Sequence, residues 1–118
     1  MNIKNLQVPN GTNSVALISG ACRVLTSSFI ETSNVNPAVI YLRDSSAASN
    51  DYVLCISLAP GESTRDYFGK HGLRFESGIY VQYQTGQVRG VLQTVMEEEF
   101  QTYMEELKAV VNIASAGL

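Results

Sequence analysis

The residues best suited to chemistry in this chain are its single histidine, His71, and its two cysteines, Cys22 and Cys55. A histidine acts as a general base when a carboxylate orients it and a nucleophile lies beside it. His71 instead lies in a short run between glycines, Gly69-Lys70-His71-Gly72. A closed structural zinc site needs four ligands, and one histidine with two strand cysteines supplies three. We therefore predict neither a catalytic nor a metal-binding role for His71.

Three other segments contain residue types that occur in functional sites. Ser63 lacks the Gly-x-Ser-x-Gly context of a hydrolase nucleophile, and the run from Gly61 to Gly69 lacks the Gly-Lys-Ser/Thr ending of a phosphate loop. The polar loop from Asp44 to Asp51 has oxygen ligands, but its spacing fits no EF-hand. We expect a protein that is not an enzyme, with no catalytic residues, no cofactor and no metal.

Both cysteines fall inside apolar segments that read as strands. A free thiol in such a segment behaves as a small buried hydrophobe, and this is the role we expect for Cys22 and Cys55. A disulfide between neighbouring strands is the alternative that the count allows.

Composition limits the classes of partner. The formal charge of −3 leaves no excess of Lys and Arg to neutralise a phosphate backbone, so nucleic acid is not an expected partner. No apolar run approaches the roughly 20 residues that cross a bilayer, and the N-terminus has no apolar signal-peptide core, so we expect neither membrane insertion nor secretion by a signal peptide. With 45% hydrophobic and 16% charged residues in 118, the chain reads as one packed domain whose surface is partly covered by partners.

Short strands separated by Gly and Pro turns occupy residues 13–95. Residues 38–43 and 52–58 suit an antiparallel pair, Ala59-Pro60-Gly61-Glu62 is a turn, and Thr85-Gly86 reads as a hairpin turn before a last strand. In residues 79–84 one face of the alternation is Ile79, Val81 and Tyr83. We predict a mainly β fold, an antiparallel β-sandwich or barrel-like domain of roughly six to eight strands with one C-terminal amphipathic α-helix. The expected strands are residues 14–19, 21–32, 38–43, 52–58, 63–68, 79–84 and 87–95, the first two being separate or one strand bent at Gly20.

The two ends of the chain differ from this pattern. Residues 1–12, which contain Pro9, Asn10 and Gly11, read as an extended N-terminal arm. Residues 96–116 read as a helix. Thr94 with Glu97 matches a capping box, and the first-turn acids Glu97, Glu98 and Glu99 suit the positive end of the helix dipole. The helix packs on its own domain or on a neighbouring subunit, and the sequence leaves both open. Its apolar residues, spaced by three or four, are Met96, Phe100, Tyr103, Leu107, Val110, Val111 and Ala114.

The segment from Arg65 to Glu76 combines charge with aromatic residues. It holds three of the eight Lys and Arg residues, interleaved with three aromatics among tight turns. Arg and aromatic residues are enriched at protein interfaces, which makes this segment a candidate interface. The alternative is a strand pair with its aromatics in the core and its charges in water.

Two stretches resemble a pattern found in small virion proteins of tailed phages. They are Leu58-Ala59-Pro60-Gly61-Glu62-Ser63 and the run Phe68-Gly69-Lys70-His71-Gly72-Leu73-Arg74-Phe75-Glu76-Ser77-Gly78-Ile79-Tyr80-Val81. The strand Ala38 to Asp44 is similar too. The likeness covers residues 15 to 95 and consists of structural glycines and strand patterns, while the C-terminal helix departs from it.

The resemblance implies a bacteriophage virion protein, assembled in the host cytoplasm, most closely a capsid decoration or cement protein. Its partners would be the major capsid protein or another virion protein, and copies of itself in a dimer or trimer. A neck, tail or fibre component is an alternative. A free carbohydrate- or protein-binding module that stacks ligands on Tyr41, Tyr52, Tyr80 or Tyr83 is an alternative of another class. The interface residues that we predict are Arg65, Lys70, His71, Arg74, Phe100, Tyr103 and Leu107.

Overall fold

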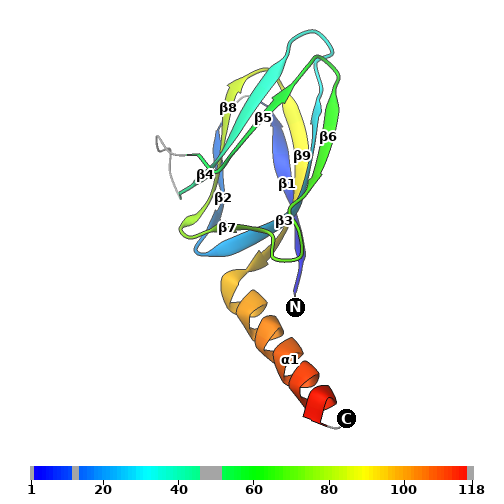
Figure 1. Cartoon of the computed structure of the whole chain (residues 1–118). Coiled ribbons are helices and arrows are strands. Elements are labelled where there is room, and N and C mark those ends of the chain that lie inside the picture. The colour runs from blue at the N-terminus through cyan, green and yellow to red at the C-terminus, as the bar shows by residue number, and fades with distance from the viewer. Residues whose placement is uncertain (1, 12–13, 46–51, 117–118) are drawn as a thin grey trace.

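The chain folds as a β-sandwich with a helix extending from one end (Figure 1). A computed structural model describes residues 2–11, 14–45 and 52–116, apart from the side chains of residues 84 and 112–116. Within this part of the chain there are nine strands and one helix. One sheet, sheet A, contains β1 (Lys4–Gly11), β3 (Cys22–Glu31), β6 (Ser63–Tyr67), β7 (Leu73–Phe75) and β9 (Val88–Met96). The other, sheet B, contains β2 (Val15–Ser19), β4 (Ala38–Asp44), β5 (Leu54–Leu58) and β8 (Gly78–Thr85). The helix is α1 (Glu97–Ala116).

All pairings between strands are antiparallel, which confirms the expected fold class. The described part has nine strands rather than the expected six to eight, because residues 4–11 and 73–75 are strands as well. The order is β1-β9-β3-β6 in sheet A, with β7 also paired to β3, and β2-β8-β4-β5 in sheet B. β4 and β5 pair as predicted, from Ala38 opposite Leu58 to Leu42 opposite Leu54.

The prediction of a free N-terminal arm over residues 1–12 is wrong. Residues 4–11 are strand β1, which pairs with β9 from Lys4 opposite Thr94 to Gly11 opposite Val88. Val8 is fully buried between the sheets, and this burial ties the strand down. β1 is an edge strand, which is where a strand tolerates a proline such as Pro9. Of the other residues of the predicted arm, Asn2 and Ile3 precede the strand, and residues 1 and 12 lie outside the described part.

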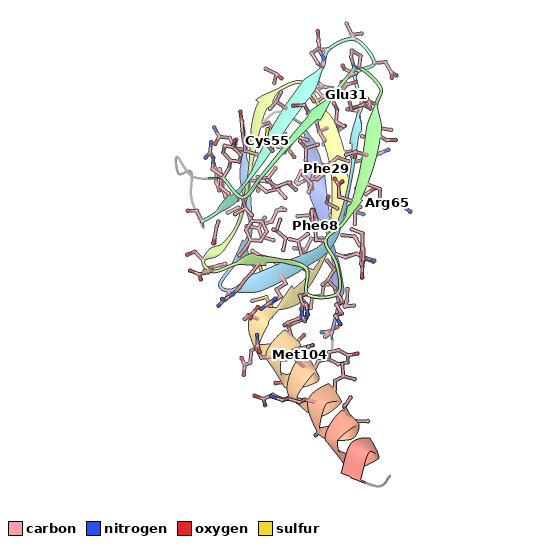
Figure 2. All side chains as sticks on the ribbon, viewed as in Figure 1. Phe29, Glu31, Cys55, Arg65, Phe68 and Met104 are labelled. Atoms are coloured by element: carbon pink, nitrogen blue, oxygen red, sulfur yellow. The ribbon has the colours of Figure 1, made fainter. Side chains whose placement is uncertain are left out.

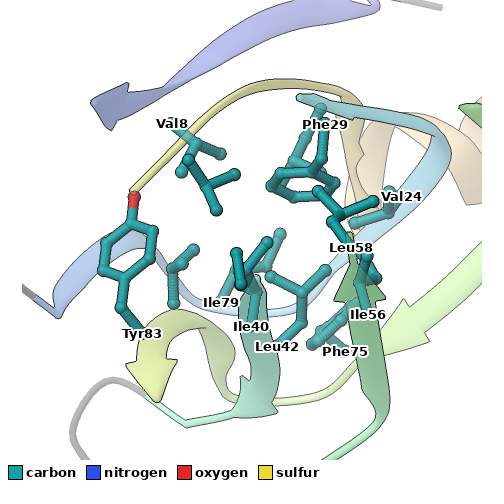
Figure 3. Packing of buried hydrophobic residues seen from close by; sticks show 14 of the residues in the cluster. Val8, Val24, Phe29, Ile40, Leu42, Ile56, Leu58, Phe75, Ile79 and Tyr83 are labelled. Carbon is teal, nitrogen blue, oxygen red and sulfur yellow. The ribbon is translucent and has the colours of Figure 1, made fainter. Parts of the chain in front are cut away.

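The core lies between the two sheets and takes large side chains from both (Figure 3). Sheet A contributes Phe29 and Phe75, and sheet B contributes Ile40, Leu42 and Ile79, all of them fully buried. The alternation predicted in β8 is confirmed, because Ile79, Val81 and Tyr83 all point into this core.

Two predicted turns are confirmed and one predicted hairpin is wrong. Glu62 N donates to Ala59 O at 2.9 Å with Gly61 at φ 73°, and Gly72 N donates to Gly69 O at 3.2 Å. By contrast, Thr85-Gly86 joins strands of different sheets, so β8 and β9 do not form a hairpin. Gly86 has φ 78° and passes so close to Pro37 that a Cβ atom would lie 2.5 Å from its carbonyl oxygen. The sequence correctly located a turn at Thr85-Gly86, but the packing of the two sheets places the following strand, β9, in the other sheet.

A buried carboxylate ties together the loops at the end of the sandwich opposite the helix (Figure 2). Glu31 accepts hydrogen bonds from the backbone N–H groups of Ser33, Asn34 and Gly61 at 2.7 to 2.8 Å, and from the Ser33 hydroxyl. Burial by itself raises the pKa of Glu31, but these hydrogen bonds favour the ionised form more strongly and lower the pKa to about 2. The Glu31 carboxylate therefore holds the loop after β3 against the turn that precedes β6.

The C-terminal helix begins at Glu97 rather than at Met96, which is the last residue of β9. The capping box predicted at Thr94 is wrong, because Thr94 is a buried strand residue whose hydroxyl donates to Lys4 O at 3.4 Å. β9 passes into α1 without a loop, and α1 projects away from the sandwich (Figure 1). The molecule is accordingly elongated, with extents of 60 × 26 × 19 Å.

Candidate interaction surface at the helix junction

An ion pair joins the first turn of α1 to sheet A. Arg23 on β3 donates from Nε to Glu97 Oε2 at 2.7 Å and from Nη2 to Glu97 Oε1 at 3.0 Å. Its third nitrogen, Nη1, donates to the carbonyl oxygen of His71 at 3.0 Å. Such a bidentate pair fixes both distance and angle between two elements. Arg23 therefore helps to fix the position of the helix base relative to the sheet.

The electrostatics of this junction favour an ionised glutamate. The hydrogen bonds from Arg23 lower the pKa of Glu97 to about 2, although partial burial opposes them, and Gln101 and the charge of Arg74 add to the lowering. Arg74 Nε lies 3.8 Å from Glu97 Oε1. Glu97 was expected to be a first-turn acid that favours the helix dipole, and the structure gives it a tertiary partner as well.

Phe100 packs beneath the ion pair and is 2% exposed. The guanidinium carbon of Arg23 lies 4.2 Å from the centre of the Phe100 ring, and the His71 ring meets Phe100 edge-on at 6.2 Å. Phe100 also belongs to a small apolar cluster with Leu25 and Val95, against which Met104 packs. The question that the sequence left open is thus answered for the helix base, which packs on its own domain.

Three of the predicted interface residues meet at this junction, namely His71, Arg74 and Phe100. Lys70 lies beside them in the same turn and is exposed. Arg65 lies on β6, outside this cluster, with its side chain in solvent (Figure 2).

The aromatic residues of the segment from Arg65 to Glu76 divide between core and surface. Phe75 is fully buried and Phe68 packs against the core, whereas Tyr67 is exposed. The segment is therefore partly the core strand pair of the alternative interpretation, with exposed charges around it.

The other two predicted residues, Tyr103 and Leu107, lie on the part of α1 that leaves the sandwich. Leu107 is 44% exposed, and Val110, one turn further, is 62% exposed. Beyond Met104, every helix residue whose side chain is described is exposed. A continuous apolar stripe thus lies in solvent along the helix, and we call Tyr103, Leu107, Val110 and Val111 the helix stripe.

Sequence reasoning missed the two residues that fix the helix, Arg23 and Glu97, as a pair. They are 74 positions apart, and no local pattern relates them. Phe100 was found because its helical spacing marks an apolar face.

A second group of polar and aromatic side chains lies on the outer face of sheet B. The rings of Tyr41 and Tyr52 are 5.0 Å apart at an angle of 56°, and Tyr52 is exposed. Arg43 lies over Tyr41 and donates to Gln82, while its Nη1 atom has no hydrogen-bond partner among the described residues. Tyr83, by contrast, is buried and donates from its hydroxyl to Pro9 O at 2.6 Å. Tyr83 is therefore not available as a stacking surface.

The two cysteines occupy different environments, and the expectation that both are buried is wrong for one. Cys22 is fully buried on β3, where burial and the nearby charges of Asp44 and Glu97 raise the pKa of its thiol to about 11. Cys55 is exposed on β5, because its side chain points outward on an edge strand. Both are free thiols on different sheets, so the alternative of a disulfide between them is wrong.

Other groups that could hold a ligand were searched across the described residues. Asp44 uses both carboxylate oxygens to accept from the backbone N–H groups of Glu76 and Ser77, and Asp51 lies outside the described residues. No group of three or more His, Cys, Asp or Glu side chains comes together in the part of the chain that is described. A hollow of about 580 Å³ on sheet A includes Pro9, Ser28 and Gly90 in its lining and contains one charged side chain, that of Arg89.

The fold and this surface define a class of protein, a two-sheet antiparallel β-sandwich with a rigidly joined, projecting C-terminal helix. Comparison of the chain with protein-family models, with curated proteins and with solved structures finds no match in any of the three. Within residues 2–11, 14–45 and 52–116, no helix is both long enough and apolar enough to cross a membrane.

Proposed function

We propose that this protein is a non-enzymatic structural subunit of a bacteriophage virion, and specifically a capsid decoration or cement protein that binds and stabilises the head shell. The observation that carries the proposal is the body plan, a small sandwich from which a rigidly anchored helix presents an uncovered apolar stripe. A helix held in this way has its direction set before any partner binds, so assembly costs little conformational entropy. This is the property that a repeated building block requires.

The contact with the shell is assigned to the exposed side of the junction. Lys70, His71 and Arg74 lie together there, with Arg65 and the exposed Tyr67 on the neighbouring strand β6. Arginine and tyrosine give large contact areas and directional hydrogen bonds, and both are enriched where proteins meet. Each contact excludes apolar surface at about 25 cal/mol per Å² before association costs, and a shell repeats it many times.

The proposal is tested on particles purified from cultures of the source organism. Mass spectrometry should find the protein in copy numbers comparable to those of the most abundant shell protein. Heads stripped of the protein should lose heat resistance and regain it when the protein is added back. Lys70→Glu should bind stripped heads more weakly than Lys108→Glu, which makes the same charge change on the helix. Absence of the protein from the particles would refute the virion role.

A neck, tail or fibre component is the alternative within the virion, and copy number separates the two. A neck ring or a tail fibre contains few copies per particle, whereas the copy number of a decoration protein rises with the number of shell subunits. A low, fixed copy number would assign the protein to the neck or tail.

A second candidate function is a carbohydrate-binding or protein-binding module on sheet B. It is favoured by the Tyr41–Tyr52 pair, of which Tyr52 is exposed. Aromatic faces stack on sugar rings. Binding to immobilised cellulose and heparin tests this, with Tyr52→Ala compared against Tyr67→Ala, since both tyrosines are exposed. A loss of about tenfold confined to Tyr52→Ala would support the module, and no binding to either polymer would remove the saccharide version.

A further inference from the structure

We infer that the helix stripe binds a second copy of this chain, so that the α1 helices form a short coiled-coil stalk. The inference rests on the proposed function in one respect, that the protein is a building block of an assembly, and it names the partner of the helix. It does not depend on where that assembly is found.

The first step is that the stripe is uncovered because of how the helix is anchored. The Arg23–Glu97 pair and buried Phe100 fix the base of α1, and Met104 is the last residue of the helix that packs on the sandwich. From there the helix continues away from the domain (Figure 1), and Leu107, Val110 and Val111 are exposed. The sandwich therefore cannot cover the stripe without breaking the junction.

The second step is the spacing of the stripe. Phe100, Tyr103, Leu107, Val110 and Ala114 follow one another by three, four, three and four positions. This is the a/d repeat of a coiled coil, which brings apolar residues back to one seam every 3.5 residues. Val111 lies next to the seam, at an e position, and widens it. Packing on a flat surface does not require this strict repeat, whereas an identical helix presents the same repeat and can pack against it.

The third step is the flank of the seam. On this repeat Glu99, Glu106 and Ile113 occupy the g positions, and Met104 and Val111 occupy the e positions. In a parallel pair each g residue faces an e residue, so Glu106 faces Val111 of the second copy. In an antiparallel pair that overlaps the seam from Tyr103 to Ala114, g faces g and e faces e, so Glu106 faces Ile113 and Met104 faces Val111. Neither orientation sets glutamate against glutamate, so charge does not oppose pairing with a second copy.

The fourth step is the size of the contact. On the helix beyond the sandwich, the seam positions run from Tyr103 to Ala114, about 17 Å at a rise of 1.5 Å per residue, or roughly two heptads. An interface of this length is small, so the association is expected to depend on concentration in the micromolar to millimolar range. A trimer buries more of each stripe than a dimer, and either number satisfies the inference.

Sedimentation of the purified full chain from about 10 μM to about 1 mM tests self-association. The wild-type protein should move from monomer to a discrete dimer or trimer as the concentration rises. Leu107→Glu places a charge in the seam and should weaken association at least about 100-fold. Ala109→Glu, two positions along on the outer side of the helix, should associate as the wild type does. A wild-type monomer at the highest concentration, or equal association of the two variants, overturns the inference.

Cross-linking tests the orientation in a Cys55→Ser background, where Cys22 is buried and does not compete. In parallel register Leu107→Cys and Val110→Cys each face their own copy, so each variant should oxidise to a disulfide-linked dimer by itself. In an antiparallel pair an a position faces a d position, and only a mixture of the two variants would cross-link. Either pattern of cross-linking supports the paired helices and identifies their orientation, whereas no cross-link in either variant or in their mixture overturns the inference.

Failure of this inference and failure of the virion role are separable. A monomer in solution that is still abundant in purified heads would overturn the stalk alone. A helix-paired oligomer that is absent from particles would overturn the virion role alone.

Discussion

Replacing Phe100 with alanine removes the side chain that holds the base of α1 against the sandwich. The ring is 2% exposed and contacts Leu25 and Val95, with the Arg23 guanidinium 4.2 Å from its centre. Truncating a buried phenylalanine costs about 3 to 5 kcal/mol through lost burial and the cavity left behind. The cluster is small and lies at the end of the domain, where the helix can settle into the space, so we expect about 3 kcal/mol.

That loss should be plain in a thermal or urea denaturation. With an unfolding entropy of about 2.1 cal/mol/K per residue, a loss of about 3 kcal/mol lowers the melting temperature of the 118-residue chain by about 12 °C. Leu107→Ala is the matched control. Its side chain lies beyond the sandwich, and in dilute solution the change should stay within about 0.5 kcal/mol.

The assay follows helix and sandwich separately, by circular dichroism at the helix band and by tyrosine fluorescence. Both signals should move together, because the junction makes the first turns of α1 part of the cooperative unit. A loss below about 1 kcal/mol for Phe100→Ala would refute the reasoning. So would a wild-type helix that melts in its own transition while the sandwich stays folded.

Three further outcomes are expected. The pKa of Glu31 is lowered from 4.5 to about 2, so its contribution to stability is present above pH 4.5 and is lost as the pH falls toward 2; Glu31→Gln should reduce this loss in acid titrations of the unfolding free energy, and an unchanged acid profile would contradict this role. Cys55 should react with a thiol reagent in the native protein while Cys22, with its pKa near 11, reacts only on unfolding; equal native rates would argue against the burial of Cys22. Gly78→Ala should destabilise far more than Gly69→Ala in urea titrations, because both have positive φ but only at Gly78 would a Cβ atom press on a neighbouring carbonyl oxygen; equal losses would show that backbone strain alone decides.

Local chemistry made part of this fold predictable. The turn over residues 59–62 depends on a proline that sets φ and a glycine that accepts a positive value, and both are visible in the sequence. The alternation in β8 follows directly from a half-buried strand. The helix was visible from its apolar spacing and its acidic first turn.

Long-range packing made the rest unpredictable. Lys4 to Gly11 form a strand because β9, more than 80 residues later in its first pairs, offers them a partner. Thr94 has the right spacing for a cap, but its place in β9 buries it in the sheet. Thr85-Gly86 has the composition of a hairpin turn, but the arrangement of the two sheets takes the chain from sheet B to sheet A at this point.

The candidate site shows the same division. The spacing of Phe100, Tyr103 and Leu107 marked an apolar face but did not show where along the helix the domain ends. The sequence marked His71 and Arg74 as candidates because of the chemistry of their side chains. Arg23 binds the carbonyl oxygen of His71 and pairs with Glu97, which also lies near Arg74, but no pattern in the sequence around Arg23 indicated these contacts.

The direct passage from β9 into α1 also determines how the protein carries mechanical load. A pull on the helix is transmitted to β9 with no slack segment between them, and β9 lies between β1 and β3. Hydrogen bonds in antiparallel pairs run perpendicular to the strands, so a pull along β9 shears both rows at once rather than opening them one bond at a time. The sandwich therefore resists tension on its helix through two strand pairs together.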